Sequence, residues 1–176
     1  MNETNWIQKV LSEYERPLVR YATRLVGDVD QARDIVQECF MRLCKQVRAD
    51  VEPHVDRWLF TVVRNRALDV GKRESRLTSM TETQMERGSS RLDPALNLEQ
   101  EDTAARVMRE LETLPDNQSE VLRLKFQNGF AYKEIAEVTG LSVGNIGFLI
   151  HVGLKTLRER MASMRDETLG TNEVQS

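Results

Sequence analysis

The chain has 176 residues, of which 40% are hydrophobic and 30% are charged, a balance typical of a soluble globular protein of one or two small domains. Its formal net charge is only −3, which excludes a uniformly basic nucleic-acid binder and confines any basic surface to part of the molecule. No apolar run approaches the roughly 20 residues of a membrane-spanning helix, and the N-terminus lacks the basic-then-apolar profile of a signal peptide. We therefore expect a cytoplasmic protein with no membrane insertion.

The cysteines and histidines do not predict a metal site. Cys39 and Cys44 are five positions apart on a predicted helix and diverge, and His54 and His151 add no zinc-binding spacing. The chain also lacks a glycine-rich phosphate loop, a Ser-His-Asp or His-Cys set, and a carboxylate pair in an apolar context. We therefore expect no metal, no cofactor and no enzymatic activity.

Apolar residues recur at helical spacing through the first part of the chain, which predicts helices rather than strands. A first helix ends at Gly27, and Pro17 within it either kinks the helix or begins a second one. We expect a second helix from Gln31 to about Val47, a loop from Arg48 to His54, and a third helix from about Val55 to Arg73. The residues expected to be buried are Ala32, Ile35, Val36, Cys39, Phe40 and Leu43 in the second helix and Trp58, Leu59, Val62 and Val63 in the third.

The composition changes after Arg73. The stretch from Ser75 to Asp102 is rich in Ser, Thr, Gln, Met and Glu, contains Gly88 and Pro94, and shows no sustained apolar stripe. Because such a stretch cannot bury a core, it is typical of a linker that is disordered at least in part.

Helical periodicity resumes at Thr103 and is broken at Pro115, after which Asp116 or Asn117 is expected to cap the next helix. We therefore predict an all-α fold of two small helical domains, residues 1–75 and 105–164, joined by a flexible acidic linker of residues 76–104. A polar tail of residues 165–176 is expected to fray.

The stretch from Ala131 to Met161 has the spacing of a helix-turn-helix. A short helix over residues 131–139 contains the small residue Ala136, the turn follows at Gly140, and Ser142 is placed to cap a longer helix. Glycine readily adopts the left-handed conformation of such a turn, and the apolar Ile146 anchors the second helix on the first. This combination indicates nucleic-acid binding, with an ordinary helical hairpin as the alternative.

The predicted third helix is rich in cations and carries one amide suited to base contact. Arg and Lys side chains at this density suit phosphate contact, and the amide of Asn65 suits a base edge. With the preceding loop, the helix is suited to holding a single strand with bases turned out of the stack. The alternative is a solvated basic face with the tryptophan in the core. The residues concerned are Trp58, Arg64, Asn65, Arg66, Lys72 and Arg73.

Short motifs occur in two blocks of the chain. The first block comprises Leu25-Val26-Gly27-Asp28, the run from Ala32 to Leu43, Trp58-Leu59-Phe60, Arg64-Asn65 and Ala67-Leu68-Asp69. The second comprises Leu114-Pro115, Tyr132-Lys133-Glu134-Ile135-Ala136 and Leu141-Ser142-Val143-Gly144. These blocks resemble regions two and four of bacterial RNA polymerase sigma factors of the extracytoplasmic-function (ECF) group, in the sigma-70 family. The resemblance covers roughly residues 10–75 and 105–161.

The resemblance implies a transcription initiation factor that binds core RNA polymerase, directs it to promoter DNA, melts the −10 element and contacts the −35 element. Region two would dock on the clamp helices of the β′ subunit, region four would rest on the β flap, and the linker would thread toward the active site and RNA exit path. An anti-sigma protein is a further candidate partner. The implied site residues are Asp34, Gln37, Glu38, Met41 and Arg42 for polymerase, Arg57, Arg64, Asn65, Arg66, Lys72 and Arg73 for −10, and Lys133, Ser142, Asn145, Phe148, His151 and Lys155 for −35.

The predicted recognition helix departs from the ECF pattern. Family members usually carry Lys, Ser and Arg after the apolar anchor, whereas this chain carries Gly147, Phe148, Leu149, Ile150, Val152 and Gly153. The helix therefore either reads −35 DNA, docks a protein instead, or uses Phe148 and Leu149 to fill a rearranged core. A plain helix-turn-helix regulator is a further alternative, and the region-two motifs argue against it.

Overall fold

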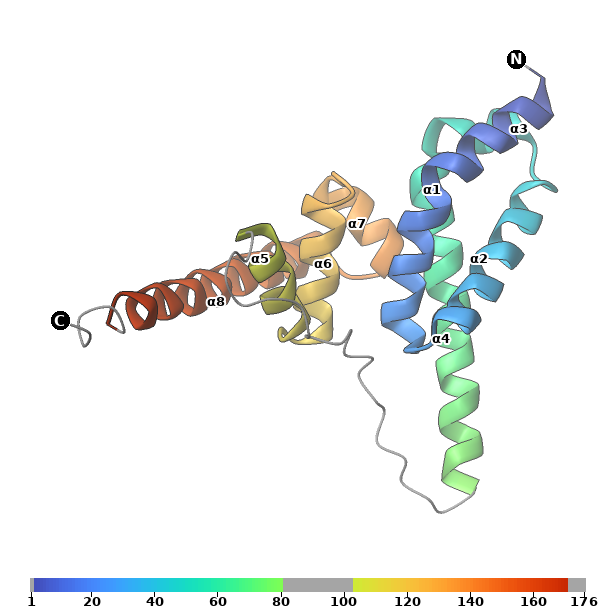
Figure 1. The fold of residues 1–176 in the computed structure, drawn as a ribbon. Coiled ribbons are helices and arrows are strands. Elements are labelled where there is room, and N and C mark those ends of the chain that lie inside the picture. Colours follow the sequence, from blue (N-terminus) through green and yellow to red (C-terminus); the bar gives the residue numbers. More distant parts are fainter. Residues whose placement is uncertain (1, 81–102, 171–176) are drawn as a thin grey trace. The chain divides into compact units, whose positions relative to one another are not determined.

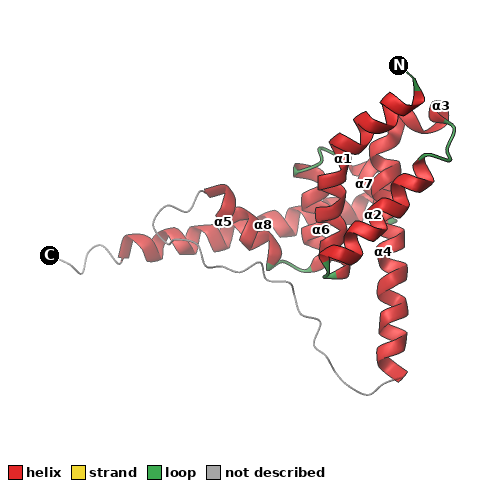
Figure 2. Ribbon diagram, turned by 45° about the vertical axis from the view of Figure 1, so that its right-hand side comes forward, coloured by secondary structure: helices red, strands yellow, loops and turns green. Residues whose placement is uncertain are grey.

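Helices make up all of the regular structure in the part of the chain that the structure describes. The computed structural model describes residues 2–80 and 103–170, and neither range contains a strand (Figure 2). The chain divides into two compact units, Met1–Pro94 and Ala95–Ser176. The predicted all-α fold with two helical domains is therefore confirmed. Most of the predicted linker, residues 81–102, lies outside the described residues.

The first unit is a bundle of three main helices joined by short turns. Its elements are α1 (Glu3–Val26), α2 (Val29–Leu43), α3 (Arg48–Val51), the 3-10 helix η1 (Glu52–His54) and α4 (Val55–Met80). Helix α1 packs against α2 and α4, and α2 also packs against α4 (Figure 1). The largest fully buried side chains between them are Leu18, Leu43, Leu59, Phe60 and Val63.

Local signals in the sequence set the ends of α1 and α2. The side chain of Asn2 caps α1 by accepting a hydrogen bond from the Asn5 N–H at 3.0 Å. At the other end, Gly27 adopts a φ of 80°, a left-handed conformation that glycine takes without steric cost, which confirms the predicted end of the helix. Asp28 then caps α2 by accepting from the Gln31 N–H at 2.7 Å.

Several predicted boundaries in the first unit are wrong. Helix α1 runs uninterrupted through Pro17, so no second helix begins there. Helix α2 ends at Leu43 rather than near Val47, because the Gln46 N–H bonds the Leu43 carbonyl at 3.0 Å and tightens the chain into a turn. The predicted loop from Arg48 to His54 consists instead of the helical turns α3 and η1.

Helix α4 is longer than predicted and buries a slightly different face. It continues to Met80, into the first residues of the predicted linker. Trp58 and Val62, both expected in the core, are half-buried on the flank of the helix. The reason is that the buried stripe is displaced by one position, and it comprises Leu59, Phe60, Val63 and Ala67.

The second unit is built around one long helix. Its elements are α5 (Thr103–Glu112), α6 (Asp116–Phe126), α7 (Tyr132–Thr139) and α8 (Val143–Gly170). Helix α8 packs against α5, α6 and α7, and α6 also packs against α7 (Figure 1). The buried residues of this unit include Leu111, Leu114, Val121, Leu122, Leu124, Phe130, Ile135, Val138, Ile146, Ile150 and Leu157.

Helices α7 and α8 form the predicted helix-turn-helix. Gly140 adopts a φ of 74° and donates its N–H to the Ala136 carbonyl at 2.9 Å, which closes α7. Ser142 caps α8, since its Oγ accepts a hydrogen bond from the Asn145 N–H at 3.2 Å. Ile146 is fully buried and anchors α8, as the spacing predicted.

The start of α6 differs from the prediction. Neither Asp116 nor Asn117 caps it; the N-cap is Pro115, which contributes no side-chain hydrogen bond. Its carbonyl instead accepts hydrogen bonds from the N–H groups of Gln118 at 2.9 Å and Ser119 at 3.0 Å. The backbone therefore closes the first turn without help from a side chain.

Helix α8 also runs further than predicted. It continues to Gly170, past the expected end near Met161 and into the predicted polar tail, whose residues 171–176 lie outside the described part. Arg160, just before that expected end, ties α8 to α5 and to the turn that follows it, because its Nη1 lies 3.5 Å from a carboxylate oxygen of Glu110 and also donates to Thr113. The helix therefore has a packing partner beyond the helix-turn-helix.

Candidate polymerase and promoter interfaces

The outer face of α2 carries the residues expected to bind polymerase. Asp34, Gln37, Met41 and Arg42 are exposed, while Glu38 is half-buried. Their spacing of three or four places them on one side of the helix, opposite the buried stripe. Met41 is 55% exposed and adds a large apolar side chain to this polar face. A mixed surface of this kind suits contact with another protein.

Glu38 differs from its neighbours because both of its carboxylate oxygens are engaged within the unit. One oxygen accepts a hydrogen bond from Arg42 Nη2 at 2.8 Å, and the other accepts from Arg66 Nε at 2.7 Å. The hydrogen bond from Arg66 is the main cause that holds the pKa of Glu38 below its usual value; partial burial opposes it, and Arg42 adds to it. Glu38 therefore links α2 to α4, where the predicted polymerase and −10 residues meet.

The α4 residues expected to contact the −10 element do not form a single stripe. An α-helix has 3.6 residues per turn, so residues seven positions apart point in nearly the same direction. The residues therefore fall into separate rows around the helix, which pair Arg57 with Arg64, Asn65 with Lys72, and Arg66 with Arg73.

Exposure distinguishes these rows. Arg57 and Arg64 are half-buried and already interact with other groups of the protein, and Arg66 is bound to Glu38. The other three residues of these rows are exposed to solvent: Asn65, Lys72 and Arg73. The row of Asn65 and Lys72 is thus the one that offers both an amide and a cation to an incoming nucleic acid.

The helix-turn-helix presents the predicted −35 residues on its outer surface. Along α8 the exposed side chains alternate with buried ones at helical spacing, so they form one stripe that begins near the capped end. Phe148 is 63% exposed, which rules out the alternative that its ring fills a rearranged core. The exposed residues are Asn145, Phe148, His151 and Lys155 on α8, the cap Ser142, and Lys133 on α7.

The glycines of α8 have contrasting surroundings. A Cβ added to Gly153 would lie 2.7 Å from Leu122 Cδ1, so this glycine permits close packing of α8 on α6. At Gly147 such an atom would make an ordinary contact with the Tyr132 ring at 3.6 Å, and at Gly144 it would meet no described atom within 4 Å. Of these three glycines, only Gly153 is therefore required by packing.

Some interactions were not predicted from the sequence. The guanidinium of Arg48 lies 5.3 Å from the centre of the Trp6 ring and donates hydrogen bonds of 2.7 Å to both oxygens of Glu52. The spacing of Arg48 and Glu52, four residues apart, could have indicated the ion pair. The contact with Trp6 had no such signal, because the residues are far apart in the sequence. The 62% exposure of Phe126 at the end of α6 was also missed.

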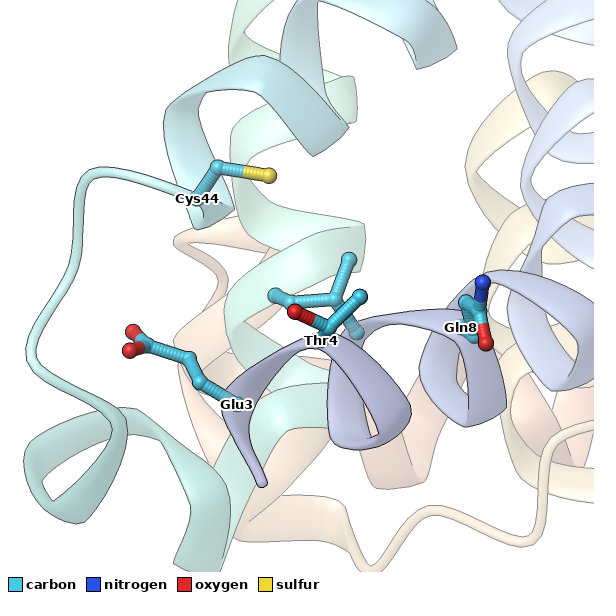
Figure 3. A pocket seen from close by; sticks show the side chains of 5 residues that line it. Glu3, Thr4, Gln8 and Cys44 are labelled. Carbon is cyan, nitrogen blue, oxygen red and sulfur yellow. The ribbon is translucent and has the colours of Figure 1, made fainter.

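A hollow of the first unit is lined by residues that are not among the predicted site residues. Glu3, Thr4, Ile7 and Gln8 on α1 line it together with Cys44, and Figure 3 shows the labelled side chains around it.

Within the described ranges, no group of His, Cys, Asp and Glu side chains is arranged to hold a metal ion. In the same ranges, no single helix has both the length and the apolar character of a membrane span; the bent pair Tyr132–Thr139 and Val143–Ser163 meets that test by length and composition alone.

Two family models match the chain, one on each helical unit. Residues 10–77 match sigma-70 region 2, and residues 104–157 match sigma-70 region 4. The ECF sigma factor EcfG of Rhodopseudomonas palustris is 31% identical over 129 residues, which cover 72% of this chain and 68% of EcfG. The chain belongs to the ECF sigma factors of the sigma-70 family. The family predicted from the sequence motifs is thereby confirmed, and this sigma factor is a promoter-specific transcription initiation factor.

Other relatives extend over most of this sigma factor. The ECF sigma factor SigL of Mycobacterium tuberculosis is 28% identical over 162 residues, which cover 89% of each chain. Among solved structures, the sigma factor RpoE in complex with the anti-sigma factor NepR from Bartonella quintana is similar with a TM-score of 0.64 at 20% identity. That match covers 88% of this chain and 96% of the RpoE chain, and it supports the fold.

Proposed function

We propose that this sigma factor binds core RNA polymerase through the outer face of α2, melts the −10 element with α4, and contacts the −35 element with α8. The proposal is carried by one observation: the region 2 and region 4 matches fall on separate helical units, each with an exposed helix face. The polymerase surfaces proposed are the β′ clamp helices for the first unit and the β flap for the second. Such a factor would act in the cytoplasm, where polymerase and promoters meet.

The α2 contact is proposed to rest on the exposed Asp34, Gln37 and Met41 more than on Glu38, which is already bound to Arg42 and Arg66. Reversing the charge of Asp34 with Asp34→Lys should weaken binding to core polymerase by roughly tenfold or more, because like charges across an interface cost several kcal/mol. Glu15→Lys makes the same charge change at an exposed site on α1 and should leave binding unchanged. If the two variants bound core polymerase with equal affinity, the proposal that α2 is the docking face would be wrong.

The −10 contact is proposed to divide between base recognition and phosphate binding on α4. Asn65 is exposed and has an amide that can pair with a base edge, so Asn65→Ala should change base preference more than overall affinity. Lys72 and Arg73 are exposed cations that suit phosphate oxygens and carry no sequence information. An equal loss at every −10 sequence in Asn65→Ala would contradict this division.

The experiment that tests the proposal as a whole is transcription by core RNA polymerase from a library of upstream sequences. With the full chain added, we expect transcripts from a subset that shares two short elements at a fixed separation. Core polymerase with the Asp34→Lys variant should give few or none of these transcripts. Transcription that is independent of the upstream sequence would refute the proposed function.

We also propose that an anti-sigma protein is a partner of this chain. The RpoE chain of similar fold was solved with its anti-sigma factor bound, and Met41 gives the outer face of α2 an exposed apolar side chain. A partner that blocks polymerase binding at α2 should compete with core polymerase and bind Met41→Asp less tightly. A complex in which the anti-sigma protein and core polymerase are both bound would contradict this mode of control.

A further inference from the structure

The outer face of the recognition helix carries an amide and an aromatic ring in a region without strong cations. From Ser142 to Leu154 the chain contains no Lys or Arg. Burial of Ile146 and Ile150 fixes the rotation of α8, so that Asn145 and Phe148 face outward on the same side. The part of α8 nearest the turn therefore offers neutral hydrogen-bonding groups and an apolar surface.

This chemistry discriminates among base pairs. In the major groove, guanine is read mainly by Arg or Lys at O6 and N7, adenine is read by Asn or Gln at N6 and N7, and the thymine methyl group is read by apolar side chains. Since this part of α8 has Asn145 and Phe148 but no Arg or Lys, its side chains match A·T pairs better than G·C pairs.

We propose that Phe148 recognises the 5-methyl group of a thymine in the −35 element, next to a base pair read by Asn145. This inference rests on the proposed function, in which α8 enters the major groove of that element. Phe148 is thereby a specificity-determining residue, and the −35 sequence of this sigma factor contains thymine at one defined position.

The geometry of the helix supports this pairing. Asn145 and Phe148 are three residues apart, which corresponds to a rise of about 4.5 Å, comparable with the roughly 3.4 Å step between stacked base pairs. Gly144 lies one turn before Phe148, is exposed, and has no described atom within 4 Å of its would-be Cβ. The bare backbone there lets the edge of a base pair approach the Phe148 ring.

The packing of the unit separates a binding role of Phe148 from a folding role. The ring is 63% exposed, so truncating it removes little from the core beneath α8. Phe126, on α6 of the same unit, is 62% exposed and provides a matched control of the same residue type. A loss specific to Phe148 therefore reports on what α8 contacts.

The test replaces single thymines of the −35 element with deoxyuridine, which removes only the methyl group and keeps the base pair. A −35 element selected by the transcription library is used, with core polymerase and the full chain. At one thymine, the substitution should weaken binding of the wild-type holoenzyme by roughly fourfold, the value of removing one buried methyl-sized group from a contact. Phe148→Ala should bind both duplexes equally, whereas Phe126→Ala should keep the fourfold difference.

The alternative outcomes are distinct. Protection of the −35 element by wild-type holoenzyme, with no deoxyuridine effect at any thymine, would overturn the role of Phe148 and leave the proposed function intact. If Phe148→Ala instead weakened binding to core polymerase in the absence of DNA, the ring would face a protein, and the inference would be wrong. Absence of −35 protection would refute the −35 contact itself and the inference together.

Discussion

The two units of this sigma factor present their candidate binding residues in different ways. In the first unit, Glu38 joins Arg42 and Arg66 through hydrogen bonds of 2.8 and 2.7 Å, so charged residues of the proposed surfaces also hold α2 to α4. In the second unit, Asn145 and Phe148 stand exposed on a helix that is fixed from beneath by apolar packing. In the first unit, ion pairs link candidate residues of α2 and α4 to one another. In the second unit, the orientation of the candidate residues depends on apolar packing beneath α8.

This difference determines whether a substitution changes binding alone or also changes the packing of its unit. Replacing Glu38 or Arg66 changes the packing of α2 against α4 as well as any contact with polymerase or DNA. Replacing Asn145 or Phe148 leaves the core of its unit almost untouched. Binding variants should therefore be chosen from exposed residues that make no ion pair within the unit, such as Asp34 in place of Glu38.

The largest expected effect tests whether packing beneath α8 organises the second unit. Gly153→Ala gains about 1 kcal/mol of helix propensity but pushes a methyl group against the buried Leu122, and overpacking costs about 1–3 kcal/mol. We expect a net loss of about 1 kcal/mol. Gly144→Ala, on the open side of the same helix, should gain about 1 kcal/mol. Amide hydrogen exchange of the second unit measures both, and equal effects would contradict the contrast.

A smaller effect tests whether charge organises the first unit. Glu38→Gln should lower the free energy of unfolding of the first unit by about 0.5–1 kcal/mol. This is the range for partly exposed ion pairs, and 34% of the Glu38 side chain is accessible. The pKa of Glu38 is lowered in the folded state, and the pKa of a Glu side chain in an unfolded chain is about 4.3. The stabilisation is therefore complete above that pH and is lost as the pH falls through the folded pKa.

Urea unfolding of the wild type and Glu38→Gln at several pH values measures this prediction. The difference between them should be present near neutral pH and should disappear in acid. Glu15→Gln, at an exposed site on α1, serves as the control and should change little at any pH. A Glu38→Gln effect that stays constant into acid would show that the carboxylate charge does not hold α2 to α4.

The smallest expected effect concerns a single phosphate contact. Lys72→Ala should reduce the slope of log affinity against log salt by about 1 for promoter DNA bound by the holoenzyme, the loss expected when one phosphate contact is removed. Lys45→Ala, an exposed lysine just after α2, should leave the slope unchanged. Identical slopes for the wild type and Lys72→Ala would show that Lys72 makes no phosphate contact at the −10 element.

The sequence predicted those features that short-range patterns determine. Gly27 and Gly140 end their helices in the left-handed conformation, Ser142 caps α8, and Ile146 is buried, all as their local context predicts. The buried stripe of α2 was likewise predicted, because it depends only on helical periodicity. These features each involve residues within a few positions of one another.

The remaining features depend on residues that are far apart in the sequence. The link between Glu38 and Arg66 joins residues 28 positions apart, so their meeting requires the packed bundle. Trp58 lies on the flank of α4 because α1 and α2 together select which face of that helix is covered. The exposure of Phe148 likewise follows from how α8 rests on α7, which composition alone does not determine.

The most direct test of the division between the two units is a paired footprint of the holoenzyme on a selected promoter, with DNase protection read at −35 and permanganate reactivity of unpaired thymines read at −10. Asn145→Ala combined with Phe148→Ala should lose −35 protection, yet at saturating holoenzyme the −10 thymines should still react. Asn65→Ala combined with Lys72→Ala should keep −35 protection and lose −10 reactivity. If either pair of substitutions removed both signals equally at saturation, or neither signal, the assignment of one promoter element to each unit would be wrong.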